Sequence, residues 1–546
     1  MTDVADQARH MHSPTPVNKT LFQAFEWHTP GPHWTRLAKY LPQLTDLGIT
    51  SIWLPPGCKA NSPQGNGYDC YDLWDLGEFD QKWTRPTKWG SKEELLRLIS
   101  SAHALNVTVI WDAVLNHKTA GDATEPCWAV EVDPTDRRIE TTKPREIEPW
   151  IHYNFPGRGD TYSSLKWHWQ HFNGTDWDQR GQQHGIFKII NPPSPDDKMR
   201  LSQSRRSKDW ALDVDDENGN GDYLMFSNID YTNLEVREDV LRWGQWMVQD
   251  VGDGIDGFRL DAVQHYSQAF TIQWIERVQA AGRQRGKDID VIGEFWQPDC
   301  RKLIAWVDFM KQQAMLFDVP LLNNFGQLKR LPPQSRWSRF RRPIRPPFDM
   351  RLIFEGTLTQ YRPNNAVTVV ANHDTQPGQA MDTPIEPLFT THAYALILLT
   401  ARGTPCVFYG DLYGIGGPAP RGPSCRGKLP SLIMARKLYA YGKEHLTFPN
   451  SRTLALIRQG TRDKPDGCVM IMTIGEGTTA RLPVGGQEKA GSVWTDLLCN
   501  SPQEVKIDRQ GYGEFTCPAE GCCVFVRKDA EGREKFPPPC SINIYE

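Results

Sequence analysis

Four short polar clusters in the sequence carry residue types that are suited to acid–base and nucleophilic chemistry. They are residues 112–117 (DAVLNH), 257–265 (GFRLDAVQH), 293–296 (GEFW) and 371–374 (ANHD). In the second cluster, Arg259 and Asp261 stand two residues apart at the end of a short apolar stretch. Side chains with this spacing leave a strand on the same face.

The spacing of Arg259 and Asp261 indicates a possible chemical role for the carboxylate. A guanidinium beside a carboxylate favours the ionised acid, and an ionised carboxylate at the mouth of a fold can act as a nucleophile. An isolated Arg-x-Asp is more often a buried structural ion pair. The three other clusters reverse that preference here, because each of them also follows an apolar stretch.

The elements that must position these clusters form a repeating pattern. Apolar stretches typical of buried strands alternate with segments in which apolar residues recur at helical spacing. The expected strands are 21–27, 51–54, 107–115, 257–263, 289–295, 314–322, 366–371 and 405–409. The expected helices are 34–47, 93–105, 240–251, 269–285, 302–311 and 388–401.

About eight alternating strands predict an α/β protein with a (β/α)8 TIM barrel. A doubly wound sheet is the alternative, but it requires a glycine-rich phosphate-binding turn after the first strand, and none follows Trp27. In a parallel barrel, working residues lie where strands end at the carboxyl face. The four polar clusters are therefore expected to converge there.

The rest of the chain divides around this barrel, which we assign to residues 21–117 and 229–441. Residues 118–228 are too numerous for a βα loop and predict an inserted domain after strand 3. Short β stretches in 442–528 predict a C-terminal antiparallel β-sandwich domain. The polar N-terminal segment 1–20 and the tail 529–546 carry too few apolar residues for a core.

Composition and charge indicate which kinds of binding partner and which cellular compartment to expect. The chain has 62 basic and 66 acidic residues with a formal net charge of −4, which gives no reason to expect nucleic acid or a membrane. Its start lacks an apolar run of signal-peptide length, so we expect a cytoplasmic protein. The twelve cysteines are then expected to be mainly free thiols. We also expect a monomer.

The four clusters, in their order and spacing, resemble the four motif regions of the α-amylase family of glycoside hydrolases. Phe25-Glu26-Trp27, Gly67-Tyr68-Asp69 and residues 217–220 (ENGN) resemble liquefying bacterial and intracellular fungal members of that family. The resemblance covers about residues 21–528. It implies a retaining reaction on α-1,4-linked glucans.

The resemblance assigns Asp261 as nucleophile, Glu294 as general acid/base and Asp374 as the third carboxylate. These residue types fit the reaction, because retaining hydrolysis needs one carboxyl that attacks the anomeric carbon and one that protonates the departing oxygen, about 5 to 5.5 Å apart. We expect the neighbouring carboxylates to raise the pKa of Glu294.

The resemblance also implies a set of substrate-binding side chains, which are Tyr68, His117, Arg259, Gln264, His265, Trp296 and His373. Tyr68 would stack on the sugar that the two histidines, His117 and His373, would hydrogen-bond. Trp296 would line the leaving-group side of the active site, and Asp112 would orient Arg259. Gln264 departs from the family, which usually places Lys there, so the contact with the acceptor sugar is expected to lose a charge.

A structural Ca²⁺ ion is implied by the same resemblance, with Asn116, Asp222, Asn228 and the carbonyl of His265 as ligands. Oxygen ligands suit this hard cation. Ala211, Asn228 and Thr232 stand where relatives carry carboxylates, so we expect one weakly held ion rather than a cluster of several. Three further acids, Asp176, Asp213 and Asp230, are then expected to be ordinary surface residues.

The leading interpretation is endo-acting hydrolysis of α-1,4-glucosidic bonds in starch, glycogen or maltooligosaccharides. The closest alternative is a 4-α-glucanotransferase, which shares the catalytic residues and differs in how the acceptor side treats water. A non-catalytic glucan-binding protein is disfavoured because Asp261, Glu294 and Asp374 are all present.

Overall fold

The computed structural model describes residues 17–192, 208–330 and 348–538. Eight parallel strands close into a barrel in the order β1-β2-β5-β12-β13-β14-β15-β16. The strands are β1 Leu21–Gln23, β2 Ser51–Leu54, β5 Thr108–Ala113, β12 Gly257–Leu260, β13 Asp290–Gly293, β14 Met315–Phe317, β15 Ala366–Thr368 and β16 Thr404–Phe408. The predicted (β/α)8 barrel is confirmed.

Helices surround the barrel. The longer ones are α1 Trp34–Leu47, α2 Lys92–Ala104, α3 Leu234–Gln249, α4 Gln268–Gln284, α5 Cys300–Phe309, α6 Val319–Gly326, α8 Thr390–Leu399 and α10 Leu429–Tyr439. The short helices α7 Leu358–Tyr361 and α9 Tyr409–Tyr413 follow α6 and β16. In α1, Leu37, Leu41 and Leu44 are buried, which is the spacing of one helix face. Helix α10 was not expected from the sequence.

Two predicted elements differ in their limits because of local capping. The apolar segment 314–322 is not one strand: β14 ends at Phe317, and the Asp318 side chain then accepts the Leu321 N–H and begins α6. Helix α3 begins at Leu234 rather than 240, because the Asn233 side chain accepts from the N–H groups of Glu235 and Val236. In both cases a capping side chain overrides the apolar pattern.

The inserted domain is built on a six-stranded antiparallel sheet in the order β6-β11-β9-β10-β7-β8. Its strands are β6 His117–Lys118, β7 Cys127–Glu131, β8 Arg145–Ile147, β9 Phe172–Asp178, β10 Gln183–Ile190 and β11 Ser227–Ile229. A small two-stranded sheet, β3 Lys59–Ala60 with β4 Cys70–Asp72, lies in the loop after β2. The strands β6 and β11 open and close the insertion, so the chain enters and leaves it side by side.

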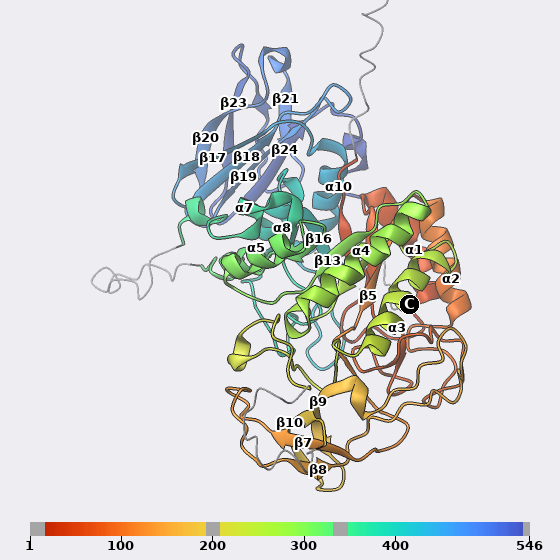
Figure 1. Cartoon of the computed structure of the whole chain (residues 1–546). Helices are drawn as coiled ribbons and strands as arrows, with labels where there is room; N and C mark the ends of the chain where they lie inside the picture. The colour runs from red at the N-terminus through yellow and green to blue at the C-terminus, as the bar shows by residue number, and fades with distance from the viewer. Residues whose placement is uncertain (1–16, 193–207, 331–347, 539–546) are drawn as a thin grey trace, which may run out of the picture.

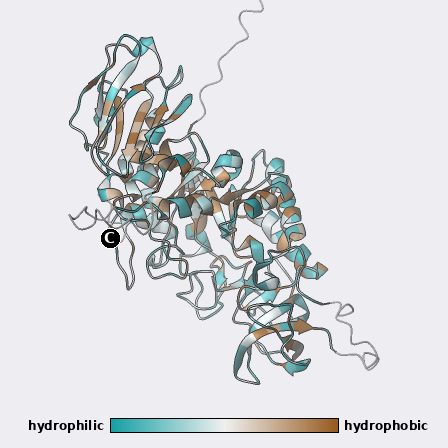
Figure 2. Cartoon of the chain, turned by 90° about the vertical axis from the view of Figure 1, so that its left-hand side faces the viewer, coloured by the Kyte–Doolittle hydropathy of each residue, from teal (hydrophilic) through white to brown (hydrophobic). Residues whose placement is uncertain are grey.

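The C-terminal domain has a six-stranded sheet, β17-β18-β19-β24-β21-β22, and a two-stranded sheet, β20-β23. The strands are β17 Glu444–Asn450, β18 Thr453–Arg458, β19 Cys468–Thr473, β20 Thr478–Pro483, β21 Val493–Asp496, β22 Val505–Lys506, β23 Tyr512–Cys517 and β24 Cys522–Arg527. A separate core that includes Ile471, Leu482 and Phe515 joins the two sheets. The C-terminal domain and the inserted domain lie at opposite ends of the barrel (Figure 1), and hydrophobic residues follow the C-terminal strands (Figure 2).

Cysteine placement agrees with the expectation of free thiols. The eleven cysteines in the described residues are all unbonded, and ten of them are buried. Cys522 and Cys523 face different cores, as adjacent residues of a strand must. Within the described ranges, no helix combines the length and the apolar character that crossing a membrane requires. The expectations for residues 1–16 and 539–546 lie outside the described residues.

Candidate active site

Arg259 is the centre of the candidate active site. It points from β12 and is 1% exposed. Its Nη1 donates to Asp112 Oδ1 at 2.8 Å and to Asp261 Oδ1 at 2.7 Å, while its Nη2 pairs with Glu294 Oε2 at 2.6 Å. One buried guanidinium therefore holds the proposed nucleophile and the proposed acid on its two amino groups.

The turn after β12 gives Glu294 a second fixed contact. Ala262 adopts a left-handed conformation (φ 48°, ψ 47°) before the short 3-10 helix η5 Val263–His265. In this conformation its N–H donates to Glu294 Oε2 at 3.1 Å. Non-glycine residues in that region store about 1 kcal/mol or more of strain, which accumulates at functional sites. Glu294 Oε1 is buried and has no hydrogen-bond partner in the described structure.

Burial raises the pKa of two of the proposed catalytic carboxyl groups. Burial, with the charge of Asp261 adding to it, raises the pKa of Glu294. The expected direction is confirmed, but burial contributes more than the neighbouring carboxylates do. Burial and the charge of Glu294 also raise the pKa of Asp374 well above its ordinary value. A raised pKa is what a carboxyl group needs in order to act as a general acid near neutral pH.

Asp112 connects this cluster to the aromatic residues beside it. Its Oδ2 accepts from Tyr68 OH at 2.8 Å and from Trp53 Nε1 at 3.0 Å, while its Oδ1 accepts from Arg259. Burial raises the pKa of Asp112 to about 7. Asp112 therefore orients Arg259, as expected, and also fixes the ring of Tyr68.

Tyr68, His373 and Trp27 form a group of parallel rings at the strand ends. The Tyr68 and His373 ring centroids are 5.0 Å apart at 5°, and the Trp27 ring is 6.0 Å from each of them. His373 Nε2 lies 3.2 Å from Asp374 Oδ2. Burial, with the charge of Arg259 adding to it, lowers the pKa of His373 well below its ordinary value, which favours the neutral ring.

Sequence reasoning assigned no role in the site to Trp27 or Gln23. Gln23 Nε2 donates to His373 Nδ1 at 3.0 Å inside the barrel. Trp27 is half-buried next to Tyr68. Both lie on or just after β1, so the rule that strand ends carry function could have found them, had it been applied to the first strand.

The remaining predicted substrate-binding residues occupy different environments. His117 is buried, and its Nε2 donates to the Tyr68 carbonyl at 2.8 Å. His265 donates from Nδ1 to the Gly221 carbonyl at 2.7 Å, which ties the barrel to the inserted segment. Trp296 is half-buried against the inner barrel core, and Gln264 has a buried Oε1 without a hydrogen-bond partner in the described structure. Contacts of these four side chains with a sugar stay predictions.

The predicted calcium ligands come together, and their free oxygens fit a cation. Asn116 Nδ2 contacts His117 Nδ1, and Asn228 Nδ2 donates to the Asp222 carbonyl and to Asn173 Oδ1. These contacts leave Asn116 Oδ1 and Asn228 Oδ1 buried with no hydrogen-bond partner in the described structure. Burial raises the pKa of Asp222 to about 8, as expected of a carboxylate that lacks a counter-charge.

The expectation that three nearby acids are ordinary surface residues is wrong for Asp230, which is buried, whereas Asp176 and Asp213 are partly exposed and accept hydrogen bonds. Asp230 is 3% exposed and pairs with Lys208 Nζ at 2.9 Å and with Thr232 Oγ1 at 2.6 Å. Asp213 accepts from Ser267 Oγ and from the Ala269 N–H at the start of α4, both at 2.8 Å. Asp176 Oδ2 accepts the Phe226 N–H at 2.9 Å. Each has a structural partner that sequence spacing could not show.

A TIM barrel that places three carboxyl groups on one buried guanidinium, beside stacked aromatic rings at its strand ends, fits a barrel glycoside hydrolase. The model of the family "Alpha amylase, catalytic domain" matches residues 33–464. The chain belongs to the α-amylase family, and its near full-length similarity to α-amylases identifies its reaction as the endo-hydrolysis of α-1,4-glucan bonds.

Relatives match along almost the whole chain. It is 38% identical over 516 residues to an α-amylase of Bacillus licheniformis, covering 94% of each chain. It is 38% identical over 520 residues to the cytoplasmic α-amylase of Escherichia coli, covering 93% of this chain and 99% of that one. Among solved structures, an α-amylase of Geobacillus thermoleovorans in complex with acarbose has a TM-score of 0.56 at 17% identity, covering 94% of this chain and 98% of that one, which supports the fold.

Proposed function

We propose that the chain cleaves internal α-1,4 bonds by a retaining double displacement, with Asp261 as nucleophile and Glu294 as general acid/base. The observation that carries this proposal is the bridge that Arg259 makes between Asp261 Oδ1 and Glu294 Oε2. Two carboxyl groups on one guanidinium suit the separation of about 5 to 5.5 Å that retaining enzymes use. The geometry thus favours direct attack over an interposed water.

In the first half of the reaction, Glu294 protonates the glycosidic oxygen from Oε1, because Oε2 is held by Arg259 and by the Ala262 N–H. Asp261 attacks the anomeric carbon with Oδ2, since Oδ1 faces Arg259. The bond from that carbon to the glycosidic oxygen breaks. The reducing-side glucan leaves as an alcohol, and the other part remains as an ester of Asp261.

In the second half, Glu294 is a carboxylate and takes a proton from water. The water oxygen attacks the anomeric carbon, and the ester bond to Asp261 breaks. Both residues return to their starting states, and two inversions give a product with α configuration. Proton NMR in the first minutes of reaction tests this directly, because an initial β signal would exclude Asp261 as a nucleophile.

We propose that the rings of Tyr68 and Trp27 bind the sugar whose bond is cleaved, while His373 and Asp374 hold its hydroxyls. Tyr68 cannot turn freely, because its hydroxyl donates to Asp112. Flat, fixed aromatic faces suit sugar rings. Contacts from Asp374 that tighten as the oxocarbenium ion forms would lower the barrier.

We propose one calcium ion at Asn116 Oδ1, Asp222, Asn228 Oδ1 and the His265 carbonyl. The orphaned amide oxygens and the buried acid support it. When bound, the ion would neutralise Asp222 and join the inserted domain to the end of β12. The pairing of Asp230 with Lys208 and Thr232 supports a single ion, because an ammonium already balances that acid.

A 4-α-glucanotransferase activity is the second candidate, and Gln264 is the observation that favours it. A neutral amide with an unpartnered Oε1 changes how an acceptor sugar is held relative to water. Maltoheptaose incubated with the purified chain, followed by mass spectrometry, separates the two. Shorter products alone indicate hydrolysis, and a ladder above the starting length indicates transfer.

We propose that the protein works in the cytoplasm as a monomer on a soluble glucan or maltooligosaccharide. The eleven unbonded cysteines of the described ranges support a reducing compartment, as does the similarity to the cytoplasmic enzyme. The proposed catalytic groups all come from one chain, so a second copy is not required. Cell fractionation and light scattering test these two proposals.

A further inference from the structure

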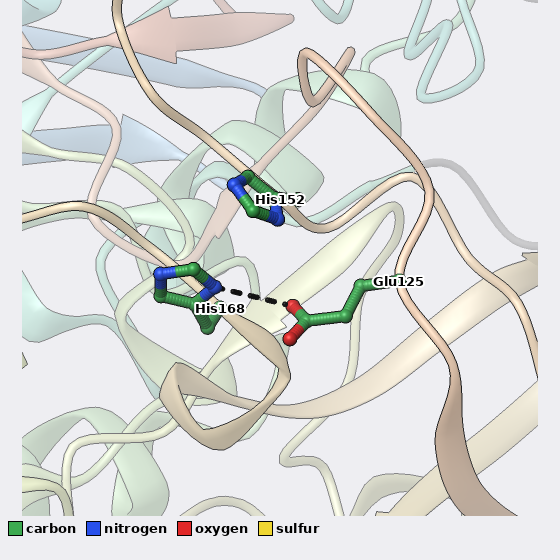
Figure 3. A group of neighbouring side chains, drawn as sticks. All are labelled: Glu125, His152 and His168. Carbon is green, nitrogen blue, oxygen red and sulfur yellow. Dashed lines mark ion pairs between the residues drawn. The ribbon is translucent and has the colours of Figure 1, made fainter.

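The inserted domain holds a cluster of side chains that the proposed hydrolysis does not use. Glu125, His152 and His168 converge (Figure 3), and each offers one ligand atom within 4.8 Å of the others. Within the described ranges, no second group of three His, Cys, Asp or Glu residues is this close. All three side chains are half-buried, and none belongs to the proposed calcium ligands.

Paired backbone segments hold the three residues in place. Ala123 and His152 form an antiparallel bridge, with reciprocal N–H to carbonyl bonds of 3.2 Å. Tyr153 and Trp167 form the next bridge, with bonds of 2.8 and 3.0 Å. The segments that carry Glu125, His152 and His168 therefore lie side by side before any ligand binds.

Polar contacts also orient the three side chains. His152 Nε2 lies 3.1 Å from Asn154 Oδ1, an acceptor, so Nε2 carries the proton and Nδ1 is free to bind a metal. Glu125 Oε2 accepts the Trp169 N–H at 3.0 Å and lies 3.5 Å from His168 Nδ1. The neighbouring His171 is not available, because its Nδ1 accepts the His168 N–H at 2.8 Å.

We propose that Glu125, His152 and His168 bind a zinc ion, with water in the fourth position. Two imidazoles and one carboxylate suit Zn²⁺, whereas Ca²⁺ prefers oxygen ligands alone. Tetrahedral bonds of about 2.0 to 2.1 Å place ligand atoms roughly 3.4 Å apart. Ligand atoms that already lie within 4.8 Å reach that spacing by small side-chain rotations.

A zinc ion here would cross-link three segments of the inserted domain. His168 immediately precedes the 3-10 helix η1 Trp169–His171, and the Gln170 carbonyl in that helix accepts from Lys208 Nζ at 2.8 Å. Lys208 in turn pairs with Asp230 near the barrel. The site would therefore stabilise the inserted domain and the segment that leads to its junction with the barrel.

The test uses the full chain, from which metals are removed with a chelator before calcium is added back. Co²⁺ then serves as a spectroscopic probe of binding, and Zn²⁺ serves as its competitor. His10, His12 and Cys499 are replaced by Gln, Gln and Ser in every protein, so that they bind no metal. We expect one equivalent of Co²⁺ with visible bands of tetrahedral intensity, displaced by Zn²⁺. Glu125→Gln, His152→Gln and His168→Gln should each abolish them, and Asn154→Ala should weaken affinity about 10- to 100-fold.

His184→Gln is the matched control, because this exposed imidazole lies in the same domain on β10 and should leave binding unchanged. Each variant must melt like the parent in chelator. If a variant melts differently from the parent, diethylpyrocarbonate labelling of the parent replaces the binding measurement on that variant. In this labelling, zinc should protect His152 and His168 but not His184. Absence of stoichiometric binding by the parent, or binding that survives in all three ligand variants, would overturn the proposal and leave a metal-free His–Glu contact.

Discussion

Gln23 and His373 are joined by a buried hydrogen bond of 3.0 Å that fixes the tautomer of the histidine. The amide Nε2 of Gln23 donates to Nδ1, so the ring proton lies on Nε2, which faces Asp374 Oδ2 at 3.2 Å. A residue on β1 thereby decides that His373 presents a donor rather than an acceptor beside the third carboxylate.

The first prediction concerns a variant that exchanges donor and acceptor in the hydrogen bond between Gln23 and His373. The Glu carboxylate of Gln23→Glu would accept a hydrogen bond from Nδ1–H and favour a charged His373, so the hydrogen bonds to Asp374 and to the sugar would change. We expect kcat to fall about 10- to 100-fold, the value of one strong hydrogen bond, with little change in melting temperature. Gln23→Met, which removes the bond without adding charge, is the matched control and should cost less. Equal activity in both variants and the parent would contradict the proposed role.

The second prediction separates Asp261 from Glu294. Asp261→Asn should abolish turnover of every glucan substrate, because no nucleophile remains. Glu294→Gln should abolish turnover of starch but retain measurable cleavage of maltosyl fluoride, because fluoride leaves without a proton. Steady-state assays with both substrates test this, and melts establish folding. Activity on starch within tenfold of the parent for either variant would refute that residue's assignment.

The third prediction concerns calcium. Chelation should lower the melting temperature, and calcium at a hundredfold excess over Kd should restore about 2.7 kcal/mol. Asn228→Asp should bind calcium more tightly because it adds a charged ligand. Without calcium it should be less stable than the parent, because Asn228 Nδ2 donates to Asn173 and Asp222 and a carboxylate cannot. The variant should therefore depend more on calcium, and an unchanged melt under chelation in both proteins would contradict the site.

The fourth prediction is acid sensitivity at the contact between the barrel and the C-terminal domain. His392 in α8 donates to the Thr473 carbonyl of β19 at 3.2 Å, and burial lowers its pKa from 6.5 to about 4. The unfolded chain therefore takes up a proton as pH falls below 6.5, whereas the folded chain does not until about pH 4. Between pH 7 and pH 5 this residue should cost about 2 kcal/mol of stability.

Chemical unfolding at the two pH values tests this contribution. His392→Gln keeps a donor for Thr473 and should lose less stability between pH 7 and pH 5 than the parent. His184→Gln, which replaces an exposed imidazole, should match the parent. His33 and His117 share the lowered pKa of about 4, so the parent should still lose stability in acid after one replacement. An unchanged pH dependence in His392→Gln would exclude this residue as a contributor.

The sequence by itself determined the barrel, the order of its strands and the four polar clusters at their ends. Local periodicity and strand alternation were sufficient, because each barrel element buries one face that its own residues encode. The pairing of Arg259 with Asp261 followed from their spacing on one strand. The limits of α3 and α6 did not follow, because single capping residues decided them.

Tertiary structure decided how distant residues share partners. Gln23 and His373 are 350 positions apart, and so are the side chains of Glu26 and Gln376, which are joined at 3.0 Å. The burial of Asp230 and its pairing with Lys208 could not be derived from composition, because an acid's environment depends on what folds over it. The gathering of Glu125, His152 and His168 likewise required the strand bridges of the inserted domain. Sequence specifies local conformation through short-range sterics, whereas the contacts between distant side chains and their pKa values arise only when the whole chain folds.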